Sequence, residues 1–448
     1  MWIVFIISAV LGATLFLSRR EAIGLLFIMA LATSGFQIIP SEWFKSPIFF
    51  AKPYDYAYLS TAIILTFRVN RITEILRVFS IARDAVLYCL LIGLISLVSL
   101  LLFSYNVVQV VQSARLFIWP IFLILFLCAD YSSLRRVSEI LFPIVLITSL
   151  LYIQQLFTGL VVFSVSGDEA PRYLEGSNLL RFLATPDFLI FFLLMASSNI
   201  QRGRLPAYTG SLGNWFMLIA TLVVQFASFT RSALVATVLA LSHILLGGKS
   251  RVLATFASIS LFAVVAIVIS LNPTMAQRFG DGVEDITSTL EGGFIVNDGR
   301  FDGNLAFRIG HLHERASYIL EDPARWPIGI GMIHEESEAA ANLGFRVGLL
   351  SVERGGVVQV DTGDIAWSIL IVKTGVIGVI ALLYFLYRSY RYAGSINSSE
   401  SAVFQGACLY FIITSIFGNS FASPSLMMQL MFFLALALRS KHKINLDK

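Results

Sequence analysis

Apolar runs long enough to cross a lipid bilayer recur along almost the whole of this 448-residue chain. A helix needs roughly 20 apolar residues to span the hydrocarbon core, and only helices and closed barrels satisfy their backbone polar groups there. Hydrophobic residues make up 57% of the chain and charged residues 13%, against roughly 25% charged residues in soluble domains. We therefore expect an all-α, polytopic membrane helix bundle of about twelve or thirteen spans.

The apolar runs divide the chain into three parts. About ten runs fall in residues 1–271 and about three in residues 365–448, on either side of a polar segment at 272–364. The expected spans are 2–18, 21–39, 54–68, 85–104, 110–129, 139–160, 182–199, 213–229, 232–247, 252–271, 365–387, 402–418 and 421–438.

Basic residues predict the orientation of the spans, because cytoplasmic loops carry an excess of Lys and Arg. In this chain they fall at alternate ends of successive spans, which places the N-terminus outside, the C-terminus in the cytoplasm and the segment 272–364 outside. The net charge of +4 comes from these scattered residues, so no nucleic-acid partner is expected. The residues that mark the cytoplasmic ends are Arg19, Arg20, Arg71, Arg77, Arg83, Arg135, Arg136, Arg202, Arg204, Lys249, Arg251, Arg388, Arg391, Arg439 and Lys441.

The polar segment 272–364 is the expected place of the chemistry. It holds 15 of the 28 acidic residues and three of the five histidines, together with seven arginines and no lysine. A membrane protein that interrupts its spans with one such segment usually carries its site there, and we expect this large outer loop to be mostly helical.

Arg231 is the first candidate site residue. It lies in a turn between two apolar runs, on the side where the positive-inside tendency does not expect it. One interpretation is a turn arginine whose side chain reaches the lipid headgroups. The other is an anion-binding arginine at the outer face, because the guanidinium fork matches phosphate bidentately.

The stretch NLAFRIGHLHERASYIL at 304–320 predicts an amphipathic helix that ends before Pro323. Its apolar positions recur at helical spacing, and Arg308, His311 and Arg315 share an adjacent face. That face is either a solvated charged surface or part of an anion site. The apolar positions are Leu305, Ile309, Leu312, Ala316 and Ile319.

Two motifs follow in the same segment. The sequence PIGIG at 327–331 is a turn cluster that lets the backbone approach a ligand closely. Asp361 and Asp364 come just before the next span, where they fit a helix N-cap and the N3 position. Asp364 also fits a carboxylate beside the anion site, acting as general base. Asp361 and His311 are further candidates for binding an acceptor.

Charges inside or near the spans add further candidates. Lys373 and Asp187 lie within expected spans, where a lipid-facing charge is costly, so we expect both to face the protein interior, and a pairing between them is one option. Arg115 and Arg181 lie near the outer ends of their spans and extend the arginine cluster, with Arg172 as a weaker candidate.

The ordered set of motifs resembles the O-antigen ligase and O-antigen polymerase superfamily, bacterial glycosyltransferases of the C-type membrane architecture. The resemblance covers about half the chain. It is carried by SFTRSAL at 228–234, by Arg308 with PIGIG at 327–331, by DIAWSILIVKTGVIG at 364–378 and, more weakly, by RFLATPD at 181–187. Ligases of this family typically place a histidine where this chain has Asp364, which favours a polymerase. Before Gly375 the family often has an acidic residue, whereas this chain has Lys373.

The resemblance implies a metal-independent glycosyltransferase without a cofactor, in the bacterial inner membrane, with its active site at the periplasmic face. Such enzymes use a sugar chain on undecaprenyl diphosphate as donor and act with inversion. Arg231 and Arg308, with Arg181, Arg115 and Arg315, would neutralise the leaving diphosphate. The expected partners are this lipid-linked oligosaccharide, membrane lipid, a chain-length regulator and a flippase.

Two alternatives remain open at this point. A ligase would transfer finished polymer to lipid A–core. A transporter or flippase of lipid-linked sugars would need charges along a central path, whereas the arginines of this chain cluster toward one face.

Overall fold

The computed structural model describes the chain in stretches separated by gaps. They are residues 2–39, 41–44, 51–159, 172–173, 180–181, 185–202, 210–228, 230–247, 280, 284, 286–287, 304–335, 337–348, 350–351, 356–357, 359–360, 362–396 and 398–446. The expected span at 252–271 and the candidate Asp361 lie outside the described residues.

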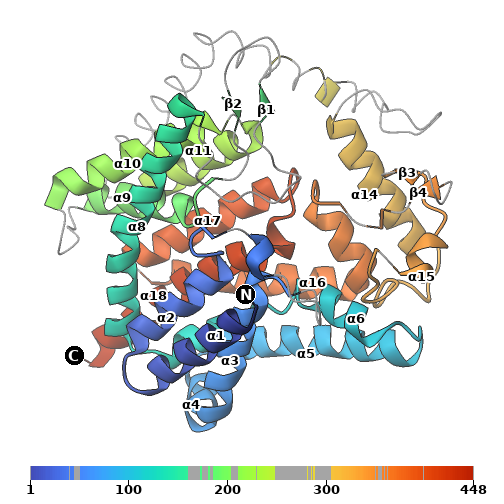
Figure 1. Cartoon of the computed structure of the whole chain (residues 1–448), viewed down its shortest axis with the longest axis horizontal. Helices are drawn as coiled ribbons and strands as arrows, with labels where there is room; N and C mark the ends of the chain where they lie inside the picture. The colour runs from blue at the N-terminus through green and yellow to red at the C-terminus, as the bar shows by residue number, and fades with distance from the viewer. Residues whose placement is uncertain are drawn as a thin grey trace.

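Helices make up nearly all of the regular structure (Figure 1). Those before the polar segment are α1 (Trp2–Leu17), α2 (Glu21–Ala32), η1 (Ser41–Phe44), α3 (Pro53–Phe67), α4 (Val69–Val78), α5 (Ser80–Leu101), α6 (Val107–Ala114), α7 (Ile121–Cys128), α8 (Tyr131–Thr158), α9 (Leu189–Arg202), α10 (Gly210–Ala227) and α11 (Arg231–Leu246). Those that follow are α14 (Asn304–Leu320), α15 (Glu338–Ala341), α16 (Ala366–Gly394), α17 (Ser399–Thr414), η4 (Ser420–Ala422) and α18 (Pro424–Leu446).

Two short antiparallel hairpins complete the described elements. Strand β1 (Arg172–Tyr173) pairs with β2 (Leu180–Arg181), and β3 (Leu350–Ser351) pairs with β4 (Gly356–Val357). In the first hairpin Arg172 lies directly opposite Arg181. Arg181, expected near the outer end of its span, and Arg172, the weaker candidate, are therefore paired positions of one hairpin.

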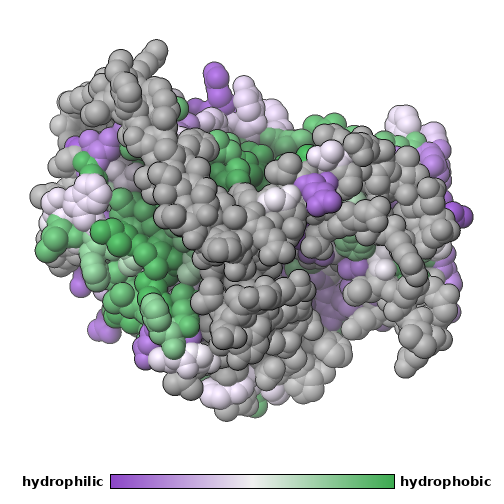
Figure 2. All heavy atoms as spheres, turned by 90° about the horizontal axis from the view of Figure 1, so that it is seen from above, coloured by the Kyte–Doolittle hydropathy of each residue, from purple (hydrophilic) through white to green (hydrophobic). Residues whose placement is uncertain are grey.

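Four described helices are long and apolar enough to cross a membrane: α5, α8, α10 and α16. On α5 the exposed residues form one apolar stripe, because Leu87, Leu90, Leu94 and Leu97 recur every three or four positions and are 50–63% exposed. Figure 2 shows the same kind of surface over much of the left half of the visible face. Exposed apolar surface on this scale marks contact with lipid, so the chain is a helical membrane protein, while the number of spans stays a prediction.

The most deeply buried helices are α7 and α18, which lie in contact with each other. Every residue of α7 from Phe122 to Cys128 is at most 2% exposed, and the run from Met427 to Leu438 on α18 is equally buried. Phe126 and Phe432 meet with ring centroids 5.4 Å apart, and Phe433 stacks on Phe191 of α9 at 4.8 Å. A helix that is apolar on all sides belongs in the middle of a bundle, and other helices of the main core pack around these two.

The expected span at 110–129 is two helices. The chain leaves α6 at Ala114 and re-enters a helix at Ile121, with Pro120 at the N-cap. Proline cannot donate a backbone hydrogen bond, so a helix boundary here costs little. Trp119 holds the break in place, because its indole Nε1 donates to the carbonyl of Phe421 at 2.9 Å and its side chain is fully buried.

The two ends of the bundle carry different long-range contacts. At one end Arg71 lies 3.4 Å from Asp130, Arg388 lies 3.6 Å from Asp84, and Arg439 donates to the Leu127 carbonyl. At the other end of α5 the Ser99 hydroxyl accepts from the backbone N–H of Met332 at 2.8 Å. Three of the basic residues expected to be cytoplasmic thus lie at one end, and the polar segment contacts the other.

The PIGIG turn at 327–331 docks into a break in α16. Gly375 has left-handed backbone (φ 63°), which interrupts the helix. The turn bridges the break, because Ile330 donates to the Val372 carbonyl at 2.9 Å and Val376 donates to the Trp326 carbonyl at 2.8 Å. A Cβ on Gly375 would lie 2.4 Å from the backbone nitrogen of Gly329. These glycines therefore allow two backbones of this chain to meet, rather than a backbone and a ligand.

Candidate functional site

A cavity of about 230 Å³ opens where six segments meet. Its wall is formed by Gln37 after α2, the residues before and at the start of α9, the turn from α10 to α11, the end of α17, η4 and the first turns of α18. These segments include residues more than 200 positions apart in sequence, and one sequence-derived candidate, Asp187, lines the cavity.

Arg308 and Asp364, two of the candidates for catalysis, lie side by side. The guanidinium Nη2 of Arg308 is 3.3 Å from the carboxylate Oδ1 of Asp364, although 56 positions separate them. The other carboxylate oxygen accepts from the Thr362 hydroxyl at 3.2 Å. The Arg308 guanidinium also lies over the ring of Phe417, 6.0 Å from its centroid. Phe417 lines the cavity, so this ion pair stands at the cavity's edge.

Arg231 lies between two residues that line the same cavity. It is the first residue of α11 and is half-buried. Its two neighbours, Thr230 and Ser232, both line the cavity. Arg231 and Arg308 thus both adjoin residues that line one cavity, although they are 77 positions apart (308 minus 231).

Asp364 does not cap a helix. Helix α16 begins at Ala366, and its N-cap is Ile365, which has no side-chain cap. The N-terminus of the helix is tied instead to the end of α17, because Ala366 N donates toward the carbonyls of Ser415 and Gly418. Asp364 is 52% exposed at the side chain, so its carboxylate is available for chemistry.

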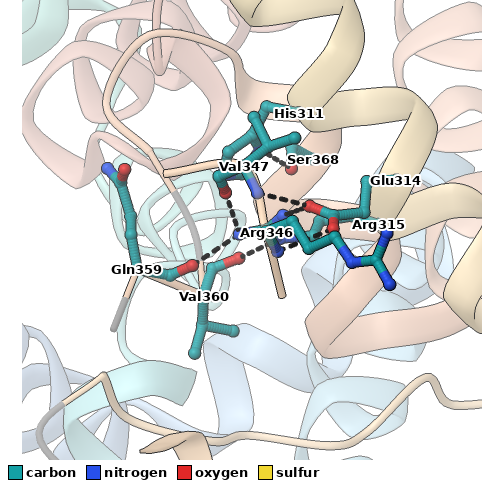
Figure 3. Close-up of polar contacts among 8 residues, drawn as sticks. All are labelled: His311, Glu314, Arg315, Arg346, Val347, Gln359, Val360 and Ser368. Carbon is teal, nitrogen blue, oxygen red and sulfur yellow. Dashed lines mark hydrogen bonds and ion pairs between the residues drawn. The ribbon is translucent and has the colours of Figure 1, made fainter. Parts of the chain in front are cut away.

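Arg315 has a structural role in the folded loop (Figure 3). Its side chain is fully buried and donates to the carbonyls of Val347, Gln359 and Val360, at 2.7, 2.5 and 3.3 Å. Its ion-pair partner Glu314 accepts from the backbone N–H groups of Arg346 and Val347 at 2.7 and 3.0 Å. We therefore leave Arg315 out of the proposed diphosphate site.

His311 lies on the same buried side of α14. It is fully buried, and its Nδ1 is 2.7 Å from the hydroxyl of Ser368 on α16. The helix expected at 304–320 is confirmed, but its most buried face carries His311, Arg315 and Ile319. Leu305 and Leu312, which the periodicity assigned to the apolar face, are only half-buried. The polar loop supplies backbone carbonyls to one face of α14, so an arginine can be buried there.

The remaining candidates fall into other surroundings. Arg115 forms an ion pair of 2.5 Å with Asp55 of α3. Lys373 and Asp187 are both buried, as expected, but Asp187 accepts from the Gln429 side chain at 2.6 Å instead of pairing with Lys373. Among the described residues, no group of three or more His, Cys, Asp or Glu side chains is placed to hold a metal ion.

Several cavity residues carried no signal in the sequence. Gln225, Gln429 and Phe417 lie within or beside apolar runs, where neutral polar and aromatic residues are ordinary. Asp187 gave a signal only as a buried charge. The contacts that unite these residues run between distant helices, and no local pattern encodes them.

Comparison with known proteins identifies no relative. No protein-family model matches the chain, and no curated protein matches it. What the structure itself defines is a helical membrane protein with an arginine-flanked cavity at the end of the bundle where the polar segment docks.

Proposed function

We propose that this protein is a membrane glycosyltransferase that polymerises undecaprenyl-diphosphate-linked oligosaccharide repeats into surface polysaccharide. The observation that supports this most directly is that the Arg308–Asp364 ion pair contacts Phe417 and Arg231 adjoins Thr230 and Ser232, all three of which line one cavity. Two guanidinium groups suit a diphosphate, because each can bind phosphate oxygens bidentately. A carboxylate beside them suits a general base.

The proposed reaction is one displacement at the anomeric carbon of the donor sugar. An acceptor hydroxyl forms the new C–O bond, the bond from the anomeric carbon to the diphosphate oxygen breaks, and its electron pair leaves with the diphosphate. The hydroxyl proton passes to the carboxylate of Asp364. Arg231 and Arg308 stabilise the charge that develops on the leaving group. The anomeric configuration is inverted.

The ion pair between Arg308 and Asp364 links the two roles proposed for them, diphosphate binding by Arg308 and base catalysis by Asp364. A diphosphate bound by Arg308 competes with Asp364 for the same guanidinium. Its arrival releases the carboxylate from the guanidinium, so that the carboxylate can accept a hydrogen bond from the acceptor hydroxyl. Donor binding and activation of the base are thereby linked.

The gene-deletion experiment tests the proposal. The surface polysaccharide of a deletion strain, run on a gel, should lose its ladder and keep a single repeat on the acceptor, and the plasmid-borne gene should restore the ladder. Polymer stranded on its lipid carrier would instead identify a ligase. Complete loss of surface sugar would identify a flippase.

A further inference from the structure

The wall of the cavity mixes polar and apolar side chains and is almost uncharged. Its neutral polar side chains are hydroxyls and amides, and they lie among aliphatic and aromatic residues such as Leu426, Tyr410 and Phe411. Asp187 is the one charged side chain among the described residues that line it. Its volume of about 230 Å³ far exceeds the roughly 10–15 Å³ that one water requires. Neutral hydrogen-bonding groups beside aromatic rings suit an uncharged ligand that carries several hydroxyl groups.

Asp187 is held so that one of its carboxylate oxygens remains available. Oδ1 accepts from Gln429 Nε2 at 2.6 Å, and Gln429 Oε1 accepts from the backbone N–H of Phe188 at 2.8 Å. Phe188 has left-handed backbone (φ 62°), a conformation that costs about 1–3 kcal/mol for a bulky residue and recurs at functional sites. Oδ2 has no hydrogen-bond partner among the residues that the structure describes.

Gln225 supplies a donor on the same wall. Its side chain is 2% exposed, and its amide nitrogen has no hydrogen-bond partner within the described part of the chain. The Tyr410 hydroxyl lies beside this amide, but the pair does not reach hydrogen-bond geometry. A buried donor left without a partner costs about 1–3 kcal/mol. Gln225 lines the cavity, so a rotation that turns its amide toward a ligand acceptor recovers this cost.

We propose that this cavity binds one sugar unit of the lipid-linked oligosaccharide, and that one sugar hydroxyl bridges Gln225 Nε2 and Asp187 Oδ2. A hydroxyl accepts from the amide and donates to the carboxylate at the same time, so one group satisfies both positions. The assignment rests on the proposed function and adds a sugar-binding subsite to the diphosphate site of Arg231 and Arg308.

Other ligands match the wall less well. A diphosphate inside the cavity would face a carboxylate without a cation among the described lining residues. A metal or sodium ion would satisfy Asp187 but would offer no acceptor to Gln225, because a cation binds only lone pairs. The two open positions together therefore favour a hydroxyl.

A binding experiment on the full-length protein in lipid nanodiscs separates the two sites. The probes are undecaprenyl diphosphate alone and the undecaprenyl-diphosphate-linked oligosaccharide extracted from the deletion strain. The ratio of their dissociation constants measures the contribution of the sugar. Asp187→Asn keeps the acceptor for Gln429, Gln225→Leu removes the donor, and Asp130→Asn, an exposed carboxylate at the other end of the bundle, is the matched control.

The wild type should prefer the oligosaccharide form. Asp187→Asn and Gln225→Leu should each reduce this preference about tenfold with unchanged thermal unfolding, whereas Arg308→Lys should weaken both probes by a similar factor. An unchanged preference in either cavity variant overturns the bridging hydroxyl and leaves the proposed function standing. Failure of the wild type to bind either lipid overturns the proposed function itself.

Discussion

The ion pair between Arg308 and Asp364 is too exposed to be important for stability. The side chains are 22% and 52% exposed, and exposed pairs of this kind contribute about 0.2–1 kcal/mol. The fully buried Arg315, a few residues along the same helix, is the opposite case. Substitutions at these two arginines should therefore separate catalysis from folding.

Asp364→Asn tests the role of the carboxylate as a base. Because general-base catalysis contributes about 10²–10⁴-fold, this variant should fall at least about 100-fold in the rate of polymer formation by isolated membranes, at unchanged protein level. The loop offers a matched control, since Asp322 forms a similar exposed ion pair with Arg325 at 3.2 Å. Asp322→Asn should keep its activity. Near-normal synthesis by Asp364→Asn would remove the base from the mechanism and make Asp361 the next carboxylate to test.

Arg315→Leu tests the structural role of the buried arginine. Removing one partner from a buried ion pair costs about 3–5 kcal/mol, and this change also leaves three backbone carbonyls without their donor. We expect a lower apparent Tm in detergent and faster proteolytic cleavage of the loop. Arg346→Leu, at an exposed position beside the same network, should change stability by about 0.5 kcal/mol or less. A stable, uncleaved but inactive Arg315→Leu protein would return Arg315 to the diphosphate site.

At the scale of the helix, the sequence predicts where a helix lies better than it predicts the residues at which the helix begins and ends. The expected span at 365–387 corresponds to α16, and the helix at 304–320 matches α14. In contrast, α9 begins at Leu189 rather than 182, because Pro186 and the left-handed Phe188 precede it. Apolar periodicity reports burial, but breaks depend on single residues and on partners from elsewhere in the chain.

The same limit applies to the site. Arg231 could be selected in the sequence because charge is rare around it, and Arg308 and Asp364 because the polar segment that holds them interrupts the apolar runs. Gln225 and Gln429 could not, since a neutral amide within an apolar run does not reveal whether its partner is water, a helix or a ligand. Their significance depends on the fold that brings α10 and α18 to one cavity.

Gly375→Ala tests how the loop is attached to the membrane helices. The left-handed backbone disfavours alanine by about 1 kcal/mol or more, and the new Cβ would clash with the backbone of the PIGIG turn. The loop should detach from α16, with a lower apparent Tm and loss of activity. Gly93→Ala is the control, because Gly93 lies within α5 and nothing surrounds its Cβ position. A Gly375→Ala protein as stable as the control would show that the junction is unimportant.

At the scale of the whole molecule, the function depends on the separation of the two ends. Arg308, Asp364 and the cavity lie where α16 begins, while Arg388 and its partner Asp84 lie near the other end of that helix. About 20 helical residues cover the thickness of the hydrocarbon core. We therefore expect the proposed site and the basic end to face opposite sides of the membrane, and the positive-inside tendency predicts that the basic end is cytoplasmic.

Cysteine labelling tests this orientation. In a background without the three native cysteines, Glu338→Cys is placed at an exposed position of the loop, and Ser132→Cys at an exposed position near the basic end. A membrane-impermeant maleimide applied to intact spheroplasts should label Glu338→Cys, and should reach Ser132→Cys only after the membrane is permeabilised. The unmodified cysteine-free protein controls for background. The reverse pattern would place the arginine-flanked cavity in the cytoplasm, where a periplasmic polymerase cannot act, and would end the proposal.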